Sequence, residues 1–161
     1  KGDPWRVGDT YHTTIEQYGF QVTPIQMARA TAAIANGGTL VTPHLLIEDT
    51  AKSPSKPVAQ EIPAGYYDIV KEGMRLAVTE GTVTQVNFPY LKIAAKSGTA
   101  QLGANKDRIN SWIVGFFPYD NPKYAFAVLA ESAPNNKTLG AVYAFRDTID
   151  WMHINTPNYF Q

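Results

Sequence analysis

Residues Leu91–Gln101 have the sequence LKIAAKSGTAQ, in which an apolar lead-in is followed by a cation, two hydroxyls and a glycine. This composition predicts a β-strand from Lys92 to Gln101, and alternate side chains of a strand share a face. One face of the strand carries Lys96, Gly98 and Ala100, and the other carries Ser97 and Thr99. The strand is therefore expected to present a cation and two hydroxyl groups within a few residues of each other.

These residue types suit the recognition of an anionic ligand. The hydroxyls of Ser97 and Thr99 can bind a carboxylate, and Gly98 lets a ligand lie against the backbone. Lys96 supplies positive charge and up to three hydrogen-bond donors. We therefore predict one wall of an acyl-transfer site. The alternative is that Lys96 is an ordinary exposed lysine, and the segments that flank the strand favour the functional interpretation.

Lys96-Ser97-Gly98 resembles the third motif of the penicillin-recognising serine transpeptidases and serine β-lactamases, which follows their Ser-x-x-Lys and Ser-x-Asn motifs. Further segments match in order, namely WRVGDT at 5–10, VTPIQM at 22–27, ANGG at 35–38, TPHLL at 42–46, GM at 73–74, GT at 81–82 and GFFPYDNP at 115–122. Together they are similar to the C-terminal half of the class B penicillin-binding proteins, and most like the elongation-type members. The resemblance spans roughly residues 5 to 152.

The resemblance implies an α+β fold of the serine β-lactamase and D,D-transpeptidase type, with an antiparallel sheet flanked by helices. Residues 1–161 would form the C-terminal part of one transpeptidase domain. The implied function is peptidoglycan D,D-transpeptidation through a serine acyl-enzyme, with the fragment alone inactive. The implied partners are the peptidoglycan stem peptide, β-lactams, the upstream half of the domain and other elongation-complex proteins. The implied location is the periplasmic face of the bacterial inner membrane, with the anchor in a segment outside this chain.

The resemblance also implies a role for each residue of the motif. The backbone N–H of Thr99 would form part of an oxyanion hole, and the side chains of Ser97 and Thr99 would bind the terminal carboxylate of the substrate. Gly98 would give the substrate access to the strand. Lys96 would hydrogen-bond the serine of the second motif and keep the site electropositive.

Two motifs of the family are expected upstream of Lys1, because Ser-x-x-Lys and Ser-x-Asn precede the WRVGDT-like segment in the family. The sequence holds one Ser-x-x-Lys string, at Ser53–Lys56. We reject it as the nucleophile, because Pro54 and Pro57 bracket a polar loop where the chemistry needs a serine at a helix N-terminus. Two other functions remain open: a β-lactam-binding sensor or β-lactamase relative, and a non-catalytic structural module that retains the fold.

Composition narrows the classes of function. The chain has 161 residues, 44% of them hydrophobic, which suits one domain with a single core. Lys plus Arg and Asp plus Glu both number 14, so the formal charge is zero and nucleic-acid binding is not expected. No run approaches the roughly 20 apolar residues that cross a bilayer. We expect no cofactor and no metal, because His12, His44 and His153 lack metal-ligand spacing.

Local signals predict the remaining elements. Thr23 and Gln26 form a capping box that opens a helix, which Gly37 and Gly38 end. A second helix is expected from about Tyr66 to Val78, with an apolar stripe that includes Tyr66, Val70 and Met74. Two further strands and a final helix that lies across the sheet are expected at 110–117, 124–131 and about 139–152. We expect an irregular, well-packed segment at 1–22, an edge strand or extended connector at 39–48, and a loop at 49–65. Apolar surface is expected to remain exposed on the isolated chain.

Overall fold

The computed structural model describes residues 4–14, 21–46, 62–103, 105–135 and 140–160. Its helices are α1 (Val7–Thr14), α2 (Pro24–Ala35), α4 (Ala64–Thr79) and α5 (Ala141–Asn155), and its strands are β1 (Ala94–Leu102), β2 (Arg108–Phe117) and β3 (Tyr124–Pro134). Short 3-10 turns lie at Thr84–Val86 and Pro157–Phe160. The three strands and the helices α2, α4 and α5 fall where the sequence predicted them, within a few residues.

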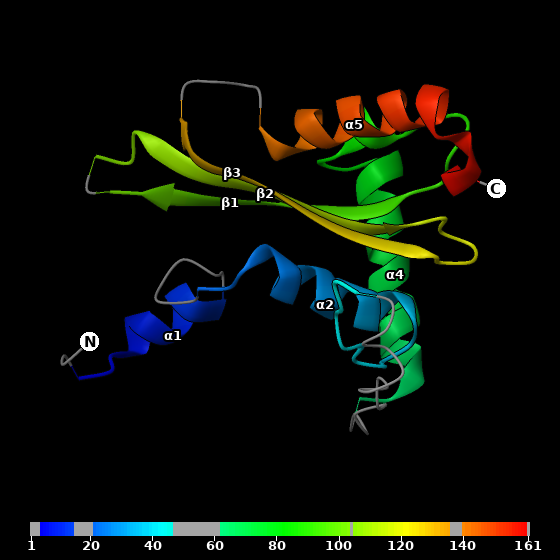
Figure 1. Cartoon of the computed structure of the whole chain (residues 1–161). Coiled ribbons are helices and arrows are strands. Elements are labelled where there is room, and N and C mark those ends of the chain that lie inside the picture. The colour runs from blue at the N-terminus through cyan, green and yellow to red at the C-terminus, as the bar shows by residue number, and fades with distance from the viewer. Residues whose placement is uncertain (1–3, 15–20, 47–61, 104, 136–139, 161) are drawn as a thin grey trace.

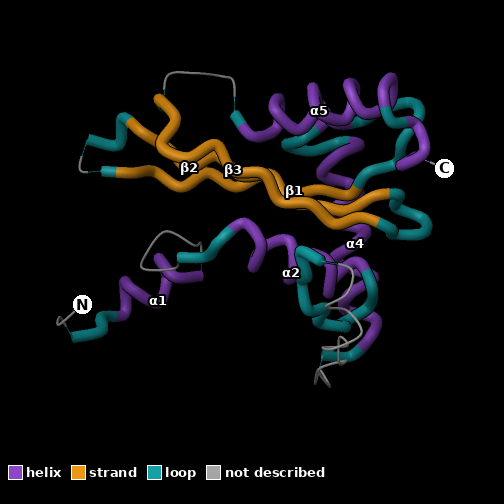
Figure 2. Tube along the Cα trace, viewed as in Figure 1, coloured by secondary structure: helices purple, strands orange, loops and turns teal. Residues whose placement is uncertain are grey.

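The strands form one antiparallel sheet in the order β1-β2-β3. Figure 1 shows α5 on one face of this sheet and α2 on the other, while α4 runs past it on the side of β1. Figure 2 shows the same three layers, with the strands between two helical layers. The predicted α+β arrangement and the predicted position of the last helix across the sheet are confirmed.

Helix α2 begins where the sequence signals place it. The Thr23 hydroxyl accepts from the Gln26 N–H, and the Gln26 side chain accepts from the Thr23 N–H at 2.8 Å. This reciprocal capping satisfies two backbone donors that the first turn leaves without helical partners. Gly37 and Gly38 follow the helix with φ of 78° and 111°, a region that glycine adopts without strain. The predicted start and end of the helix are both confirmed.

Helix α4 holds the beginning of β1 in place. Its Met74 packs with Ala94 and Phe116 on the α2 face of the sheet, whereas Val78 belongs to the core cluster on the α5 face. Between them, the Arg75 guanidinium donates to the Ile93 carbonyl at 2.8 Å. The backbone that leads into the Lys-Ser-Gly motif is therefore fixed from both faces and by a side-chain hydrogen bond.

The larger core lies between the sheet and α5. Phe145 of α5 stacks on Phe126 of β3 with ring centroids 3.8 Å apart. The buried Ser111 hydroxyl on β2 accepts from the Ala141 N–H at 3.1 Å, which satisfies a donor in the first turn of α5. These two contacts fix the helix to β2, which neighbours the motif strand, and to β3 beyond it.

An aromatic and charged cluster ties α5 to the segment before β1. The Tyr90 hydroxyl donates to Asp150 at 2.8 Å, and the Tyr90 ring stacks on His153 at 3.7 Å between centroids. Burial raises the pKa of the Tyr90 phenol above its ordinary value of 10.0, and the hydrogen bond and charge of Asp150 raise it further. The phenol therefore acts as a permanent hydrogen-bond donor at physiological pH.

Two expectations about local structure need correction. Residues Val7–Thr14 form a helix, where an irregular segment was expected, and Asp9 explains its start because its carboxylate accepts from the Arg6 N–H at 2.8 Å. The segment is also poorly packed, since Trp5 is 65% and Tyr11 69% exposed. Residues 39–46 add no strand to the sheet, so the connector is confirmed over these residues as the correct one of the two alternatives. The expected loop at 49–65 is shorter, because α4 begins at Ala64, and residues 47–61, with the Ser53–Lys56 string, lie outside the described residues.

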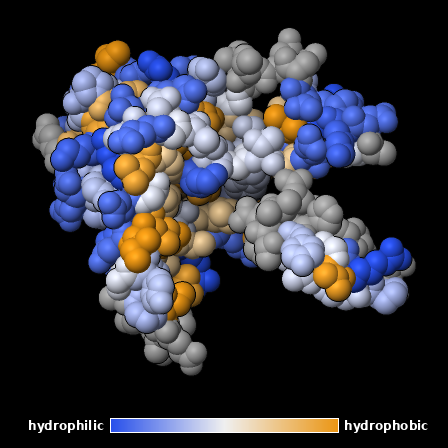
Figure 3. All heavy atoms as spheres, turned by 180° about the vertical axis from the view of Figure 1, so that it is seen from behind, coloured by the Kyte–Doolittle hydropathy of each residue, from blue (hydrophilic) through white to orange (hydrophobic). Residues whose placement is uncertain are grey.

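The apolar stripe of α4 differs from the predicted one. Tyr67, Met74 and Val78 are buried, whereas Tyr66 and Val70 are 60% and 44% exposed. Ile69 and Leu76 share the exposed face, so apolar side chains lie at helical spacing on both sides of α4. Figure 3 shows apolar surface on the side of the molecule along which α4 runs. The prediction of exposed apolar surface is therefore confirmed.

The cluster around Tyr90 leads to a prediction about stability. The Tyr90→Phe variant loses one hydrogen bond to a carboxylate, and we expect its free energy of unfolding to fall by about 1 kcal/mol near neutral pH. Because folding raises the pKa of this phenol, the stabilisation is fully present below pH ~10 and is lost as pH rises toward the folded-state pKa. Urea unfolding at pH 7 to 11, on the protein at its full natural length, measures both effects.

The matched control is Tyr143→Phe on α5, because Tyr143 makes no side-chain hydrogen bond within the part of the chain that the structure describes. It should unfold like the unchanged protein. Equal stability of the Tyr90→Phe variant and the unchanged protein at pH 7 would contradict the account of this cluster.

Candidate functional site

The Lys-Ser-Gly motif lies in the middle of β1, at the edge of the described sheet. Within the described residues β1 pairs with one strand, β2, and the register places Lys96 opposite Val114 and Ser97 opposite Ile113. Lys96 is exposed and Ser97 half-buried, so the motif forms part of the surface. A ligand can therefore approach this strand without a change in the sheet.

The predicted alternation of faces is consistent with the packing before the motif. Ala94 packs in the cluster on the α2 face, and Ala95 packs in the cluster on the α5 face. Lys96, two residues after Ala94, therefore lies on the α2 face, and Ser97 lies on the α5 face. The Lys96 ammonium donates to the Ser97 carbonyl at 2.6 Å, which holds the cation close to the strand.

Gly98 is the glycine of this sheet whose presence the packing explains least. A Cβ at Gly98 would lie 3.4 Å from the Trp112 Cβ, close to an ordinary van der Waals contact. In contrast, a Cβ at Gly115 would overlap the Ala94 carbonyl oxygen, and one at Gly140 would lie 2.5 Å from the Ser111 hydroxyl. The packing therefore excludes a Cβ at Gly115 and at Gly140, the residue before α5, whereas it leaves room for one at Gly98. The role of Gly98 in giving a ligand access to the strand stays a prediction.

Thr82 reaches the motif from another part of the chain, and the sequence interpretation assigned it no role. Its hydroxyl lies 3.2 Å from the Ser97 hydroxyl, and either oxygen can be the donor. Thr82 follows Gly81, just after the C-terminal end of α4. The Gly-Thr pair at 81–82 was a recognisable signal, but its contact with Ser97 follows from the packing of α4 against β1.

Thr99 is exposed and lies opposite Ser111 in the register. The structure therefore brings Lys96, Ser97, Gly98 and Thr99 together on one strand as the sequence predicted. The role of the Thr99 N–H in an oxyanion hole stays a prediction.

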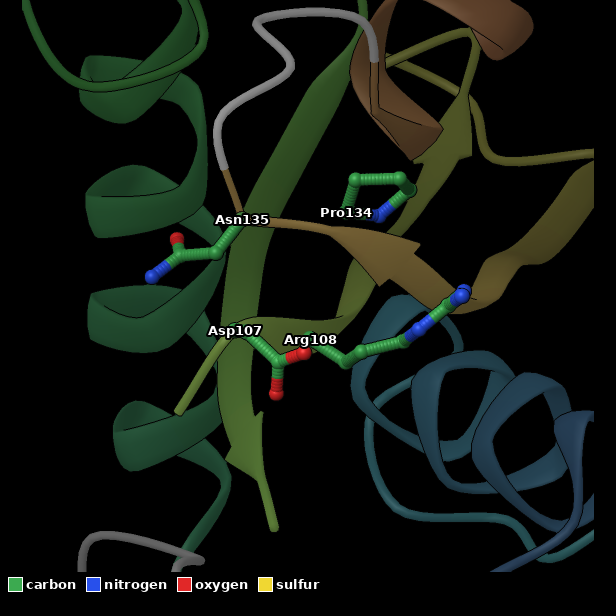
Figure 4. Close-up of a pocket in the computed structure, with 4 residues that line it drawn as sticks. All are labelled: Asp107, Arg108, Pro134 and Asn135. Atoms are coloured by element: carbon green, nitrogen blue, oxygen red, sulfur yellow. The ribbon is translucent and has the colours of Figure 1, made fainter. Parts of the chain in front are cut away.

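A hollow of about 440 Å³ lies elsewhere, at the end of the sheet beyond the motif. Figure 4 shows that it is lined by residues from the ends of β2 and β3, namely Asp107, Arg108, Pro134 and Asn135. The Arg108 guanidinium donates to the Ser132 carbonyl at 2.7 Å, and the Asn135 N–H donates to the Asp107 carbonyl at 2.8 Å. These groups tie the strand ends together, so we place the candidate site at the motif strand.

The described residues contain no group of three or more His, Cys, Asp or Glu side chains able to hold a metal ion. His153 stacks on Tyr90, and the side chain of His12 lies outside the description. Among the described helices, none combines the length and the apolar character that a membrane span needs.

An antiparallel sheet between helices, with Lys-Ser-Gly on an edge strand, defines the class of protein. The chain belongs to the family described as the penicillin binding protein transpeptidase domain, whose model matches residues 3–149. Peptidoglycan D,D-transpeptidase MrdA of Escherichia coli strain K12 is 32% identical to it, over 96% of this chain and 28% of that protein.

Solved structures agree with this membership. Penicillin-binding protein 2 from Helicobacter pylori, in its complex with MreC, superimposes with a TM-score of 0.78 and 30% identity, over 96% of this chain and 29% of that chain. Penicillin-binding protein 2 of Pseudomonas aeruginosa, in complex with WCK 5153, gives a TM-score of 0.73 and 30% identity, over 93% and 34%. The predicted family and fold are confirmed, and the chain spans about 28% of the length of the curated relative from Escherichia coli.

The different room for a Cβ at Gly98 and Gly115 predicts different costs of substitution at these two positions. Gly98→Ala should leave the melting temperature of the protein within a few degrees of the unchanged value, because its Cβ fits beside Trp112. Gly115→Ala should lower the free energy of unfolding by about 1 to 3 kcal/mol, because its Cβ has no room. Calorimetry on both variants checks this, and a Gly98→Ala protein that unfolds as easily as Gly115→Ala would contradict it.

Proposed function

We propose that this chain supplies the Lys-Ser-Gly wall of a peptidoglycan D,D-transpeptidase site. The observation that carries the proposal is the motif itself, Lys96–Thr99, on an accessible edge strand of a transpeptidase-family fold. The half-buried Ser97, the exposed Lys96 and a glycine at position 98 where the packing would accept a Cβ all support it.

In the proposed reaction a serine hydroxyl attacks the carbonyl of a stem peptide that ends in D-Ala-D-Ala. An ester forms between the serine and the peptide, the C–N bond breaks, and D-alanine leaves with the proton. An amine on a stem peptide of a neighbouring peptidoglycan strand then attacks the ester. A new amide bond forms, the ester bond breaks, and the serine recovers its proton from the amine. The product is a peptidoglycan crosslink.

In this reaction the motif residues stabilise the oxyanion and bind the terminal carboxylate. The Thr99 N–H stabilises the oxyanion of both tetrahedral intermediates, where one donor contributes on the order of 10²-fold in rate. The hydroxyls of Ser97 and Thr99 bind the terminal carboxylate of the peptide. Lys96 holds the serine of the second motif and provides positive charge. A β-lactam carries an equivalent carboxylate, so it binds in the same way and acylates the serine, which makes the enzyme an antibiotic target.

The proposal includes the rest of the site. The nucleophilic serine and the Ser-x-Asn motif come from another segment of the same transpeptidase domain, of which residues 1–161 are the C-terminal part. The greater length of the relatives and the exposed apolar face of α4 support this. By similarity to the Helicobacter pylori complex with MreC, we infer elongation-complex partners, with the enzyme anchored to the inner membrane and its active site in the periplasm.

Covalent labelling by a fluorescent penicillin tests the proposed function. In the protein at its full natural length, Lys96→Ala should lower the rate of labelling by roughly 10²-fold, because a donor and a charge at the reacting site are lost. The matched control is Lys92→Ala, since Lys92 is exposed on the same chain segment and pairs with Asp120 at 2.8 Å. The control should be labelled like the unchanged protein, and both variants should melt within a few degrees of it.

Four outcomes separate the functions that the sequence left open. Stable labelling with transpeptidation supports the proposal, whereas rapid release of the hydrolysed drug indicates a β-lactamase relative. Stable labelling without transpeptidation indicates a β-lactam sensor. No labelling of the unchanged protein indicates a structural module and would overturn the proposal.

A further inference from the structure

The contact between Thr82 and Ser97 joins two parts of the chain that are 15 residues apart. Ser97 belongs to the motif strand, whereas Thr82 lies in the turn between α4 and the 3-10 turn Thr84–Val86. The distance of 3.2 Å between the two oxygens is that of a hydrogen bond between hydroxyls. Thr82 is exposed and Ser97 half-buried, so the pair lies at the surface of the candidate site.

The position of Thr82 is fixed by the residues on either side of it. A Cβ at Gly81 would lie 2.7 Å from the Ala77 Cα, so the turn packs directly on the backbone of α4. Val83 is fully buried, and its N–H donates to the Ala77 carbonyl at 3.1 Å. Thr82 therefore sits between two anchored residues, and its hydroxyl is held beside β1.

The position of Ser97 is fixed as well, by the pairing of β1 with β2. It lies opposite Ile113, which is fully buried in the core between the sheet and α5. Since the strand cannot shift without moving this core, the freedom that remains to the Ser97 hydroxyl is rotation about its side-chain bonds. A neighbour that accepts or donates at 3.2 Å selects among those rotations.

The number of available protons then decides the direction of the hydrogen bond. A serine hydroxyl has one proton to donate, and an ionised carboxylate can only accept. When Ser97 donates its proton to a substrate carboxylate, the hydrogen bond to Thr82 persists only if Thr82 is the donor. The result is a chain in which Thr82 donates to Ser97 and Ser97 donates to the carboxylate, and each bond polarises the next.

We propose that Thr82 is a positioning residue for carboxylate recognition, which donates to the Ser97 hydroxyl and directs the Ser97 proton toward the terminal carboxylate of a stem peptide or β-lactam. This inference rests on the proposed function, because it needs Ser97 to bind that carboxylate. Thr82 does not touch the reacting carbonyl. Its contribution is therefore to ligand binding, and the chemical step proceeds without it.

Acylation kinetics with a fluorescent penicillin, on the protein at its full natural length, test this role. Thr82→Val keeps the shape of the side chain and removes the hydroxyl. We expect it to raise the apparent dissociation constant for the drug about 3- to 10-fold and to leave the limiting acylation rate unchanged. Thr82→Ser restores the hydroxyl and should restore binding. The matched control is Thr84→Val, two residues further on, which should behave like the unchanged protein.

A double-variant cycle gives the most specific readout. In a Ser97→Ala background the Thr82→Val change should cost nothing further, because Thr82 acts through the Ser97 hydroxyl. A Thr82→Val loss that adds in full to the Ser97→Ala loss, or one that appears in the limiting rate, would overturn the proposal. So would unchanged binding by Thr82→Val in a protein that the drug labels normally. If the drug does not label the unchanged protein, the proposed function fails and the role of Thr82 fails with it.

Discussion

The pairing of β1 with β2, anchored at its start by α4, is the constraint on which the candidate site depends. Ala94 and Ala95 are fully buried on opposite faces of the sheet, and the Arg75 guanidinium holds the carbonyl of the residue before them. A shift of the strand by one residue would exchange its two faces and bury Lys96. The same packing that builds the core therefore decides which motif side chains meet a ligand.

Local signals predicted much of the fold. The capping box at Thr23, the glycine stop at Gly37 and the motif strand each depend on a few neighbouring residues, and all are confirmed. The helix at Val7–Thr14 was missed because the glycines and the proline spread over residues 1–22 suggested an irregular segment, although Asp9 was present as a capping signal. On α4 the sequence misplaced the buried stripe, because apolar residues lie on two faces and only the tertiary contacts select Tyr67 over Tyr66.

The candidate site also has features that the sequence could predict and features that depend on tertiary packing. Lys96, Ser97 and Gly98 form a contiguous motif, so the sequence could predict that they lie together. The hydrogen bond between the Thr82 and Ser97 hydroxyls depends on how the end of α4 meets β1, and nothing in the spacing of 15 residues indicates it. The packing of the sheet accounts for the glycine at Gly115, whereas it leaves room for a Cβ at Gly98.

The central claim is that the edge of β1 at Ser97–Thr99 binds the carboxylate of the acyl donor. A crystal structure of the penicillin acyl-enzyme, on the protein at its full natural length, tests it most directly. The account predicts the drug carboxylate within hydrogen-bond distance of the Ser97 and Thr99 hydroxyls, and the acyl oxygen within hydrogen-bond distance of the Thr99 N–H. A carboxylate bound elsewhere, with the β1 edge free of the drug, would contradict the account.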